Sequence, residues 1–323
     1  MMNAIQVSEP GDISVLEYVQ VEKPVVAPGK IVVKNAFSGV NFIDTYFRTG
    51  LYPTTMPTLL GREGSGTVAE VGEGVTDFKV GDKVAFLTAN NSYAQYSLVD
   101  PTMVAHVPDS IGLDVAAAIL LQGLTALTLT TRSYLVKKGD IILVHAAAGG
   151  TGRLLVQLCK YFGATVIGTT STEEKALLAI ESGADHIIYY NREDVPTRVR
   201  EITGGRMVNA VFDGVGKATF QGSFDSLARC GTLVSFGNAS GKVPPIEINM
   251  LSKGNITLLR PTLFFYITTR QEFTEASQEM FNLIEKGAIK FNICEVFELP
   301  RAADAHTFLE SRKTTGKILI SID

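Results

Sequence analysis

Cysteine is scarce in this sequence of 323 residues, which contains only Cys159, Cys230 and Cys294. These residues lie more than sixty positions apart, so they form neither a disulfide framework nor a clustered metal-binding motif. Such sparse, unpaired cysteines fit a reducing compartment. We therefore expect a cytoplasmic protein.

Targeting and membrane segments are also missing from the sequence. The first residues, Met-Met-Asn-Ala-Ile-Gln-Val, lack the basic start and apolar core of a signal peptide and the Arg- and Ser-rich character of a transit peptide. We interpret them as a first strand. The longest apolar stretch, Val115 to Thr130, is interrupted by Gln122 and Gly123 and is too short for a continuous apolar helix across a bilayer. We expect no membrane segment.

Positive charge is not in excess. The 29 Lys and Arg residues are outnumbered by 33 Asp and Glu, which gives a net charge of -4, and the isoelectric point is near 5.7. The sequence has no basic tail and no arginine-glycine run, so nothing in the charge pattern favours a nucleic-acid or membrane-surface partner. Hydrophobic residues make up 46% and charged residues 19%, which is the balance of a globular enzyme.

The length of the chain favours two domains, because it exceeds what one hydrophobic core usually serves. A cleft between the domains would be the natural site. The first third contains short β-runs separated by glycine and proline, clearest at 30–37, 65–71 and 83–87. This pattern predicts a compact β-rich module.

Residues 140–260 follow a different pattern, in which apolar strands alternate with amphipathic stretches, as in the βα units of a parallel sheet. Six strands are predicted, the number of a doubly wound Rossmann sheet. They are 141–145, 165–169, 186–189, 208–212, 232–236 and 256–259. The sequence Ser171-Thr-Glu-Glu174 predicts a capping box at the start of the helix after the second strand.

The chain after Arg260-Pro261 is predicted to return to the first module, with a helix over about 270–286 and a closing strand at 317–322. The predicted fold class is α/β, with a Rossmann sheet and a β-rich domain. The predicted domains are 1–122 with 261–323, which form the β-rich catalytic domain, and 123–260, which forms the nucleotide-binding domain.

A glycine-rich turn gives the clearest functional signal. The first strand of the predicted sheet runs into Ala146-Ala-Ala-Gly-Gly-Thr-Gly152 and then into a helix. In this context glycines allow the backbone to turn tightly and approach a pyrophosphate, whose charge is met by amide groups at the helix N-terminus. Gly149, Gly150 and Gly152 are therefore candidate dinucleotide-binding residues.

The end of the second strand indicates which dinucleotide binds. An NAD-preferring site usually places an acid there, on the ribose hydroxyls. Here the residues are Gly168-Thr-Thr-Ser171, with no carboxylate before Glu173 and with Lys175 one helical turn beyond Ser171. A 2′-phosphate would meet a hydroxyl and a cation, so the sequence favours NADPH. Tyr190, just after the third strand, could cover the adenosine.

Several motifs together resemble the medium-chain dehydrogenase/reductase superfamily, and within it the zeta-crystallin-like quinone oxidoreductases. They are Gly39-Val-Asn-Phe-Ile-Asp-Thr-Tyr46, Gly61-Arg-Glu-Gly-Ser-Gly66, Gly81-Asp-Lys-Val84, Gln122-Gly-Leu-Thr-Ala126, Ala148-Gly-Gly-Thr-Gly152, Val234-Ser-Phe-Gly-Asn-Ala-Ser-Gly241 and Glu310-Ser-Arg-Lys-Thr-Thr-Gly-Lys317. The resemblance covers essentially the whole chain. It implies a GroES-like catalytic domain beside the Rossmann domain, and a homodimer.

The resemblance also implies that no zinc is bound. Zinc members of the superfamily ligate the metal with thiolates and an imidazole, but the matching positions here are Asn41, Arg62 and Gln122. The four-cysteine structural loop is absent, because no cysteine precedes Cys159. The four histidines are scattered over different predicted elements, and none is assigned to catalysis.

The residues that the resemblance places at the site fall into two groups. Asn41, Tyr46 and Tyr52 line the cleft near the nicotinamide, where an amide and two phenols can donate hydrogen bonds to an oxygen that becomes negative. Further cofactor contacts are implied for Asn41, Tyr46, Thr125, Thr151, Val215, Phe236, Gly237, Asn238, Arg260 and Arg312.

These features predict NADPH-dependent, zinc-independent hydride transfer to a quinone, whose conjugation accommodates the arriving charge without a metal. Two alternatives stay open. One is reduction of an alkenal or enone, which needs the same residues. The other is an NADPH-regulated RNA-binding or crystallin-like structural role, which the negative charge disfavours without excluding.

Overall fold

The computed structural model describes residues 1–311 and 313–322. The chain forms two compact units. The first comprises Met1–Gln122, Ile267–Glu285 and Phe291–Asp323, and the second comprises Gly123–Tyr266 and Lys286–Lys290. These units divide the chain between residues 122 and 123 and between residues 266 and 267, and residues 286–290 return to the second unit.

The second unit is built on a six-stranded parallel sheet. Its strands are β9 (Ile141–Val144), β10 (Thr165–Thr170), β11 (His186–Tyr189), β12 (Val208–Asp213), β13 (Leu227–Ser235) and β14 (Thr257–Leu259). The spatial order is β11-β10-β9-β12-β13-β14. The predicted doubly wound sheet is confirmed, and the direction of winding reverses between β9 and β12. In sheets of this kind, ligands bind at the carboxyl ends of the strands beside that reversal.

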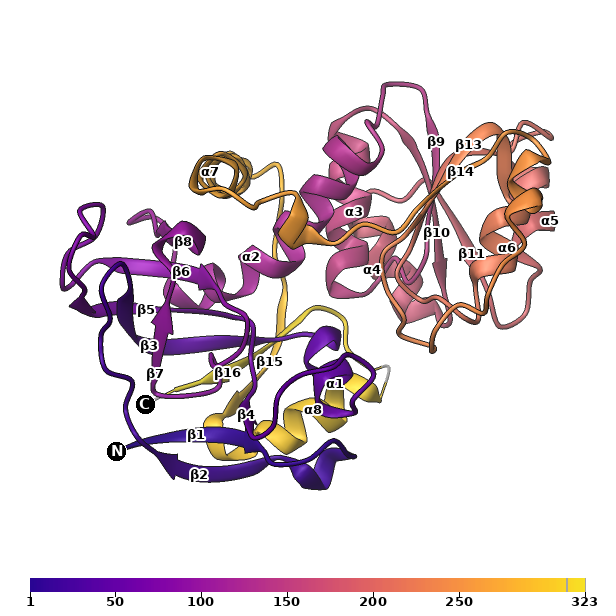
Figure 1. The fold of residues 1–323 in the computed structure, drawn as a ribbon. Coiled ribbons are helices and arrows are strands. Elements are labelled where there is room, and N and C mark those ends of the chain that lie inside the picture. The colour runs from indigo at the N-terminus through magenta and orange to yellow at the C-terminus, as the bar shows by residue number, and fades with distance from the viewer. Residues whose placement is uncertain (312, 323) are drawn as a thin grey trace. The chain divides into compact units, whose positions relative to one another are not determined.

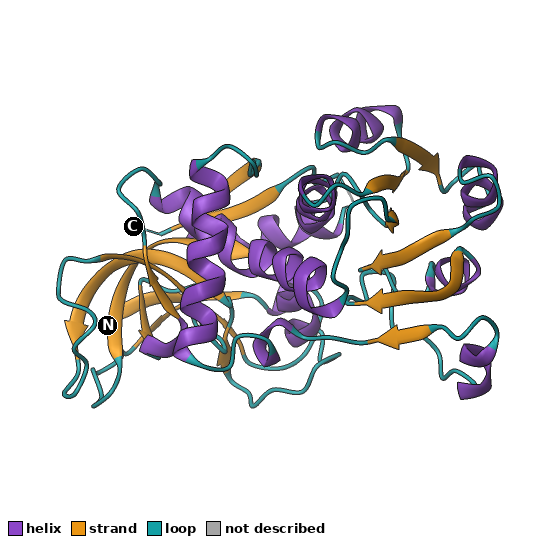
Figure 2. Cartoon of the chain, turned by 90° about the horizontal axis from the view of Figure 1, so that it is seen from above, coloured by secondary structure: helices purple, strands orange, loops and turns teal. Residues whose placement is uncertain are grey.

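Helices cover both faces of this sheet (Figure 1). They are α3 (Gly150–Tyr161), α4 (Glu173–Glu181), α5 (Val195–Ile202) and α6 (Phe220–Asp225). Helices α3 and α4 pack against β9, β10 and β11, whereas α5 and α6 pack against β11, β12 and β13. Figure 2 shows the strands of this unit between helices on either side. Strand residues such as Leu143 and Val211 are fully buried, each contributing about 1.5–3 kcal/mol to the free energy of folding.

The start of α4 differs from its prediction by one residue. The predicted capping box at Ser171 and Glu174 is wrong, because Thr172 is the N-cap and its hydroxyl accepts a hydrogen bond from the Lys175 N–H at 3.3 Å. Lys175 therefore stands at the third helical position, where a capping box requires Glu or Gln. Ser171 lies before the helix and is not used as its cap.

The first unit is rich in β-structure. A three-stranded sheet has the order β2-β1-β4, and a seven-stranded sheet has the order β15-β16-β3-β5-β6-β8, with β7 paired to β3. The strands are β1 (Met2–Val7), β2 (Glu17–Val21), β3 (Ile31–Val40), β4 (Thr58–Leu59), β5 (Glu63–Val71), β6 (Lys83–Leu87), β7 (Tyr96–Val99), β8 (Val104–His106), β15 (Ile293–Glu298) and β16 (Lys317–Ser321).

The two ends of the chain complete this unit together (Figure 1). The closing strand β16 pairs antiparallel with β3, so that Ile318 lies opposite Val40. The predicted strands at 30–37, 65–71 and 83–87 correspond to β3, β5 and β6. The helices of this unit are α1 (Phe42–Arg48), α7 (Arg270–Glu285) and α8 (Ala302–Glu310), and 3-10 turns occur at Ile13–Val15, Pro101–Met103 and Leu299–Arg301.

Helix α2 (Leu113–Thr128) carries the chain from the first unit into the second and continues as a π-helical turn at Leu129–Ser133. Gln122 and Gly123 interrupt the apolar pattern, but the helix passes through both residues. With Leu113–Ser133, the helical segment is also longer than the apolar stretch that was predicted to be too short to span a bilayer. Among the described residues, this is the one helix that is long and apolar enough to cross a membrane, but 72% of its most apolar segment is buried inside the structure. That burial is typical of a core helix. Shorter 3-10 turns of the second unit lie at Ile248–Ser252 and Leu263–Phe265.

Candidate functional site

The glycine-rich turn leads directly from β9 into α3. Gly149 is the N-cap of α3 and has extended backbone angles, and no side chain caps the first turn of the helix. The first turn also contains no acidic residue. Among the described residues, no side chain accepts a hydrogen bond from the N–H groups at this end, which is the arrangement that binds a phosphate at a helix N-terminus.

Close backbone approach explains two features of the turn. Ala146 has a φ of 50°, in the left-handed region that favours glycine. Its carbonyl accepts a hydrogen bond from the Gly149 N–H at 2.9 Å. A Cβ on Gly152 would overlap the same carbonyl oxygen, so the turn requires glycine at 152. The sequence assigned Gly152 to this turn correctly, but it gave no signal for the conformation of Ala146.

The end of β10 offers hydroxyl and basic groups. Ser171 and Lys175 are both half-buried, and Tyr190 is 48% exposed. The nearest acid in sequence, Glu173, forms an ion pair with Arg192 at 3.5 Å. Arg192 lies over the Tyr189 ring, with its guanidinium carbon 4.2 Å from the ring centroid. The local charge therefore suits an added phosphate better than a bare ribose hydroxyl pair.

Two further loops lie at the carboxyl ends of β12 and β13. Their backbones approach closely, because a Cβ on Gly237 would overlap the carbonyl oxygen of Gly214. The Arg260 guanidinium donates to the Ser235 carbonyl at 2.9 Å. With its amide oxygen turned toward Arg260, Asn238 also accepts from that guanidinium at 3.1 Å. Val215 and Phe236 are half-buried in these loops, and Thr125 is half-buried on α2.

The residues predicted to face the substrate lie in the first unit. Asn41 caps α1, and Tyr46 is within that helix. The rings of Tyr46 and Tyr52 meet edge to face, with their centroids 5.2 Å apart, and the Tyr52 N–H donates to the Tyr46 carbonyl at 3.0 Å. The structure therefore brings the two tyrosines together.

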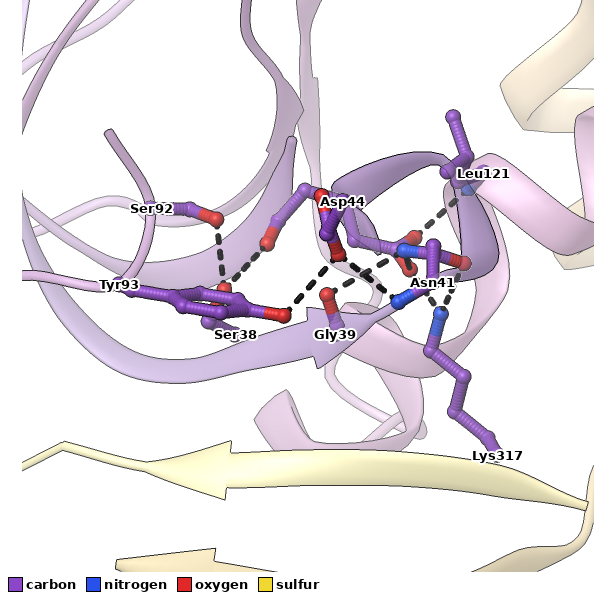
Figure 3. A network of polar contacts seen from close by, with 9 residues as sticks. Ser38, Gly39, Asn41, Asp44, Ser92, Tyr93, Leu121 and Lys317 are labelled. Atoms are coloured by element: carbon purple, nitrogen blue, oxygen red, sulfur yellow. Dashed lines mark hydrogen bonds and ion pairs between the residues drawn. The ribbon is translucent and has the colours of Figure 1, made fainter. Parts of the chain in front are cut away.

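Asn41 lies in a buried polar network that the sequence analysis missed (Figure 3). Its amide nitrogen donates to Glu63 Oε1 at 2.7 Å and to the Gly39 carbonyl at 3.2 Å, while its Oδ1 accepts from Lys317 Nζ at 2.8 Å. Lys317 also forms an ion pair with Glu63. Both charged side chains are essentially fully buried.

Glu63 connects three elements of the first unit. Its Oε1 faces Asn41 and Lys317, and its Oε2 accepts from the backbone N–H of Leu121 in α2 at 2.7 Å. Gly39 makes room for this carboxylate, since a Cβ there would overlap Oε1. One carboxylate thus fixes the start of α1, the start of β16 and a residue adjacent to Gln122.

Asp44 lies beside this network. Its carboxylate accepts from the Asn41 N–H at 2.8 Å and from the Tyr93 hydroxyl at 3.0 Å. Burial raises the pKa of Asp44 to about 6, and these two hydrogen bonds only partly oppose that rise. Burial also lowers the pKa of the neighbouring Arg62, and Asp44 partly opposes that change.

The histidines follow the expectation that they lie on separate elements. His306 is fully buried, its Nδ1 lies 3.1 Å from Arg48, and burial lowers its pKa to about 3. His145 is also buried, whereas His106 and His186 are exposed. No group of three or more His, Cys, Asp or Glu is placed to hold a metal ion in the part of the chain that the structure describes.

Comparisons with known proteins give the family. The chain matches the models of an alcohol dehydrogenase GroES-like domain over residues 27–109 and of a zinc-binding dehydrogenase over residues 150–282. It is 45% identical over 98% of its length to a probable quinone oxidoreductase of Schizosaccharomyces pombe, covering 96% of that protein. The chain belongs to the quinone oxidoreductase family.

Solved quinone oxidoreductase structures agree with this family. The Escherichia coli enzyme, solved in complex with NADPH, superposes with a TM-score of 0.97 at 41% identity, with 99% of each chain covered. A 2-haloacrylate reductase from Burkholderia is 39% identical over 95% of this chain and 94% of its own. The resemblance found in the sequence motifs is therefore confirmed for the medium-chain superfamily and for the quinone oxidoreductase branch.

The residues of the candidate site could be only partly predicted from the sequence. The glycine turn and the tyrosines could be named from motifs, but Glu63 and Lys317 could not be paired. The one available signal was a charged residue at the start of each of two strands, β5 and β16. Arg312, an expected cofactor contact, lies outside the described residues.

Proposed function

We propose that this protein transfers hydride from NADPH to a quinone. Two features together carry the proposal. The N-terminus of α3 after the glycine turn has no side-chain cap, and the segment after β10 offers Ser171 and Lys175 where an NAD site would place an acid. The first feature suits a pyrophosphate, and the second suits a 2′-phosphate. Relatives solved with NADPH support the same cofactor.

The residues proposed to hold the cofactor come from several loops. The amide groups of the turn meet the pyrophosphate, Lys175 and Ser171 meet the 2′-phosphate, and Tyr190 covers the adenosine. When bound, NADPH supplies the hydride. The proposal keeps the remaining predicted contacts, which are Asn41, Tyr46, Thr125, Gly149, Gly150, Thr151, Gly152, Val215, Phe236, Gly237, Asn238, Arg260 and Arg312.

On the acceptor side, the proposal assigns different tasks to Asn41 and the tyrosines. Both hydrogens of the Asn41 amide are already donated within the protein, so Asn41 fixes the start of α1 and is not proposed as a hydrogen-bond donor to the acceptor oxygen. The phenols of Tyr46 and Tyr52 donate to the acceptor oxygen as it becomes negative. A proton from water completes the reduction.

Zinc-independent transfer is part of the proposal. Side-chain oxygens at the start of α1 come from Asn41, Asp44 and Glu63. The Lys317 ammonium contacts Asn41 Oδ1 and Glu63 Oε1. An amide oxygen, two carboxylates and a competing cation do not make the thiolate and imidazole set that zinc prefers. The residues present therefore do not fit zinc, although residues 150–282 match a zinc-binding dehydrogenase family.

A second candidate function is reduction of an activated carbon–carbon double bond. The relative named 2-haloacrylate reductase supports it, since it is 39% identical over 95% of this chain. A conjugated carbonyl accepts hydride at carbon while its oxygen gains the charge, so the same phenols could serve both reactions.

We also propose a cytoplasmic homodimer. The sparse cysteines support the compartment, and the resemblance to the family supports the dimer. Strand β14 stands at one end of the sheet of the second unit and offers an unpaired edge for a second copy. Light scattering coupled to size-exclusion chromatography tests the assembly, and a single-chain mass would contradict it.

Steady-state kinetics test the function. Quinones and enones are compared as acceptors, each with NADPH and with NADH, in buffer treated with a chelator. The proposal expects NADPH oxidation by a quinone at a rate that the chelator does not change. A preference for NADH, or loss of turnover on removal of divalent metal, would overturn it. Faster turnover of an enone would select the second candidate.

A further inference from the structure

A network of buried hydrogen bonds contacts the glycine turn at Ala146. It joins Thr169 at the end of β10, His145 after β9, Ser223 in α6 and Asp213 at the end of β12. All four side chains are buried, with at most 4% of any residue exposed. Thr169, His145 and Asp213 lie at the carboxyl ends of three neighbouring strands in the order β10-β9-β12, beside the reversal of the sheet.

One assignment of donors and acceptors satisfies every hydrogen bond of this network. The Ser223 hydroxyl donates to Asp213 Oδ2 at 2.7 Å, so its oxygen is left to accept from His145 Nε2 at 2.9 Å. His145 Nδ1 then carries no hydrogen and accepts from the Thr169 hydroxyl at 3.0 Å. Burial lowers the pKa of His145, which keeps the ring neutral, as this assignment requires.

Each end of this hydrogen-bond network binds a backbone segment of the predicted cofactor site. At one end, Thr169 Oγ1 accepts from the N–H of Ala146, the residue with positive φ, at 3.3 Å. At the other end, Asp213 Oδ1 accepts from the N–H groups of Val215 and Gly216 at 2.9 and 3.0 Å. The network therefore connects the turn after β9 with the loop after β12.

We propose that Thr169, His145, Ser223 and Asp213 form a positioning relay that holds the glycine turn and the 214–216 loop ready for the dinucleotide. The relay rests on the proposed use of NADPH. It touches no reacting atom, and it acts by fixing backbone N–H groups before the cofactor arrives, which lowers the cost of ordering them on binding. The relay thus sets cofactor affinity without taking part in hydride transfer.

The decisive variant is Ser223→Ala, which breaks the relay at its centre and leaves His145 Nε2–H without its acceptor. The matched control is Ser226→Ala. Ser226 is also fully buried, at the C-terminal end of the same helix, but within the described part of the chain its hydroxyl donates only to the Gly222 carbonyl. A second pair of variants separates the effect of the Thr169 hydroxyl from that of its shape. Thr169→Val removes the hydroxyl but keeps the branched shape, and Thr169→Ser keeps the hydroxyl.

Two measurements test the relay. Calorimetric titration should give an NADPH Kd about tenfold higher for S223A and T169V than for the wild type. S226A and T169S should match the wild type. Amide hydrogen exchange in the cofactor-free protein should be faster at residues 146, 215 and 216 in S223A but unchanged there in S226A. At saturating NADPH, kcat and the KM for the quinone should stay at wild-type values.

The outcomes separate the relay from the cofactor proposal. If wild-type protein does not bind NADPH, the proposed function fails. If the wild type binds and S223A binds equally well with unchanged exchange at 215 and 216, the relay is overturned. Equal weakening by S223A and S226A would also overturn it, because the effect would then follow general loss of helix packing, which urea unfolding of both variants measures.

Discussion

Lys317 and Glu63 form an ion pair inside the first unit, although 254 residues separate them in the sequence. Both side chains are shielded from solvent, and Asn41 bridges them through its amide. A buried charge depends on its partner, because neither can be solvated by water where it stands. The pair therefore has consequences for stability that can be measured.

Replacing Lys317 with Met should destabilise the protein by about 3–5 kcal/mol, because it leaves the Glu63 carboxylate buried without its counter-ion. The double variant Glu63→Gln/Lys317→Met should recover most of that loss, since no unpaired charge remains. Urea unfolding of the wild type, both single variants and the double variant measures this cycle. Additive losses in the double variant would show that the two residues act independently.

Asp44 should make stability fall as the pH rises from about 4 to about 6. Its pKa is raised by burial from 3.8 to about 6, so the folded protein binds this proton more tightly than the unfolded chain does. The stabilisation is fully present below the unfolded pKa and is lost as the pH rises through the folded one. Comparing Asp44→Asn with the wild type across this range should isolate a change of roughly 1–3 kcal/mol.

Asp185 provides a control of opposite sign. Burial acts to raise its pKa, but hydrogen bonds from Lys160 and from the Val166 N–H outweigh burial and hold the pKa below 3.8. Its contribution is present above the unfolded pKa and is lost as the pH falls. The difference in free energy of unfolding between the wild type and Asp185→Asn should therefore decrease as the pH falls. The stabilisation that Asp44 contributes should instead decrease as the pH rises toward neutral.

Gly152→Ala should weaken NADPH binding by more than about tenfold, because the added Cβ would displace the Ala146 carbonyl and with it the turn. Gly222→Ala is the matched control, since its Cβ would meet only Pro196 atoms at 3.8 Å or more. Fluorescence titration with NADPH measures both variants. Unchanged affinity in a folded Gly152→Ala protein would contradict the assignment of this turn.

Lys175→Ala should reduce the preference for NADPH over NADH by about tenfold, because it removes one charge-assisted contact with the 2′-phosphate. The affinity for NADH should stay nearly constant. Lys137→Ala, which removes an exposed lysine from the same unit, should leave the preference unchanged. The readout is the ratio of kcat/KM with NADPH to kcat/KM with NADH. An equal loss of kcat/KM with both cofactors would show that Lys175 does not contact the 2′-phosphate.

Tyr52→Phe and Tyr46→Phe should each lower kcat with a quinone by about tenfold or more, because each removes a donor to the developing oxyanion. The edge-to-face ring contact survives both changes, so the unfolding midpoint should move little. Tyr161→Phe, at an exposed position on α3, should leave kcat unaltered. Full activity in the double Tyr46→Phe/Tyr52→Phe variant would remove the phenols from the reaction.

Much of the second unit could be predicted from the sequence, because a βα unit is local: an apolar strand, a turn and an amphipathic helix lie within about thirty residues. The six strands and the glycine turn followed from that pattern. Local detail was less secure. The N-cap of α4 fell on Thr172 instead of Ser171.

By itself, the sequence determined the family, the parallel sheet and the turn that suits a dinucleotide, since each depends on residues close together in the chain. Only the tertiary structure decided which buried polar groups meet. Glu63 with Lys317, and His145 with Ser223, are brought together by strand order across 254 and 78 residues. Hydrophobic periodicity sets which face of a strand is buried, but it carries no record of which distant polar side chain will satisfy a buried charge.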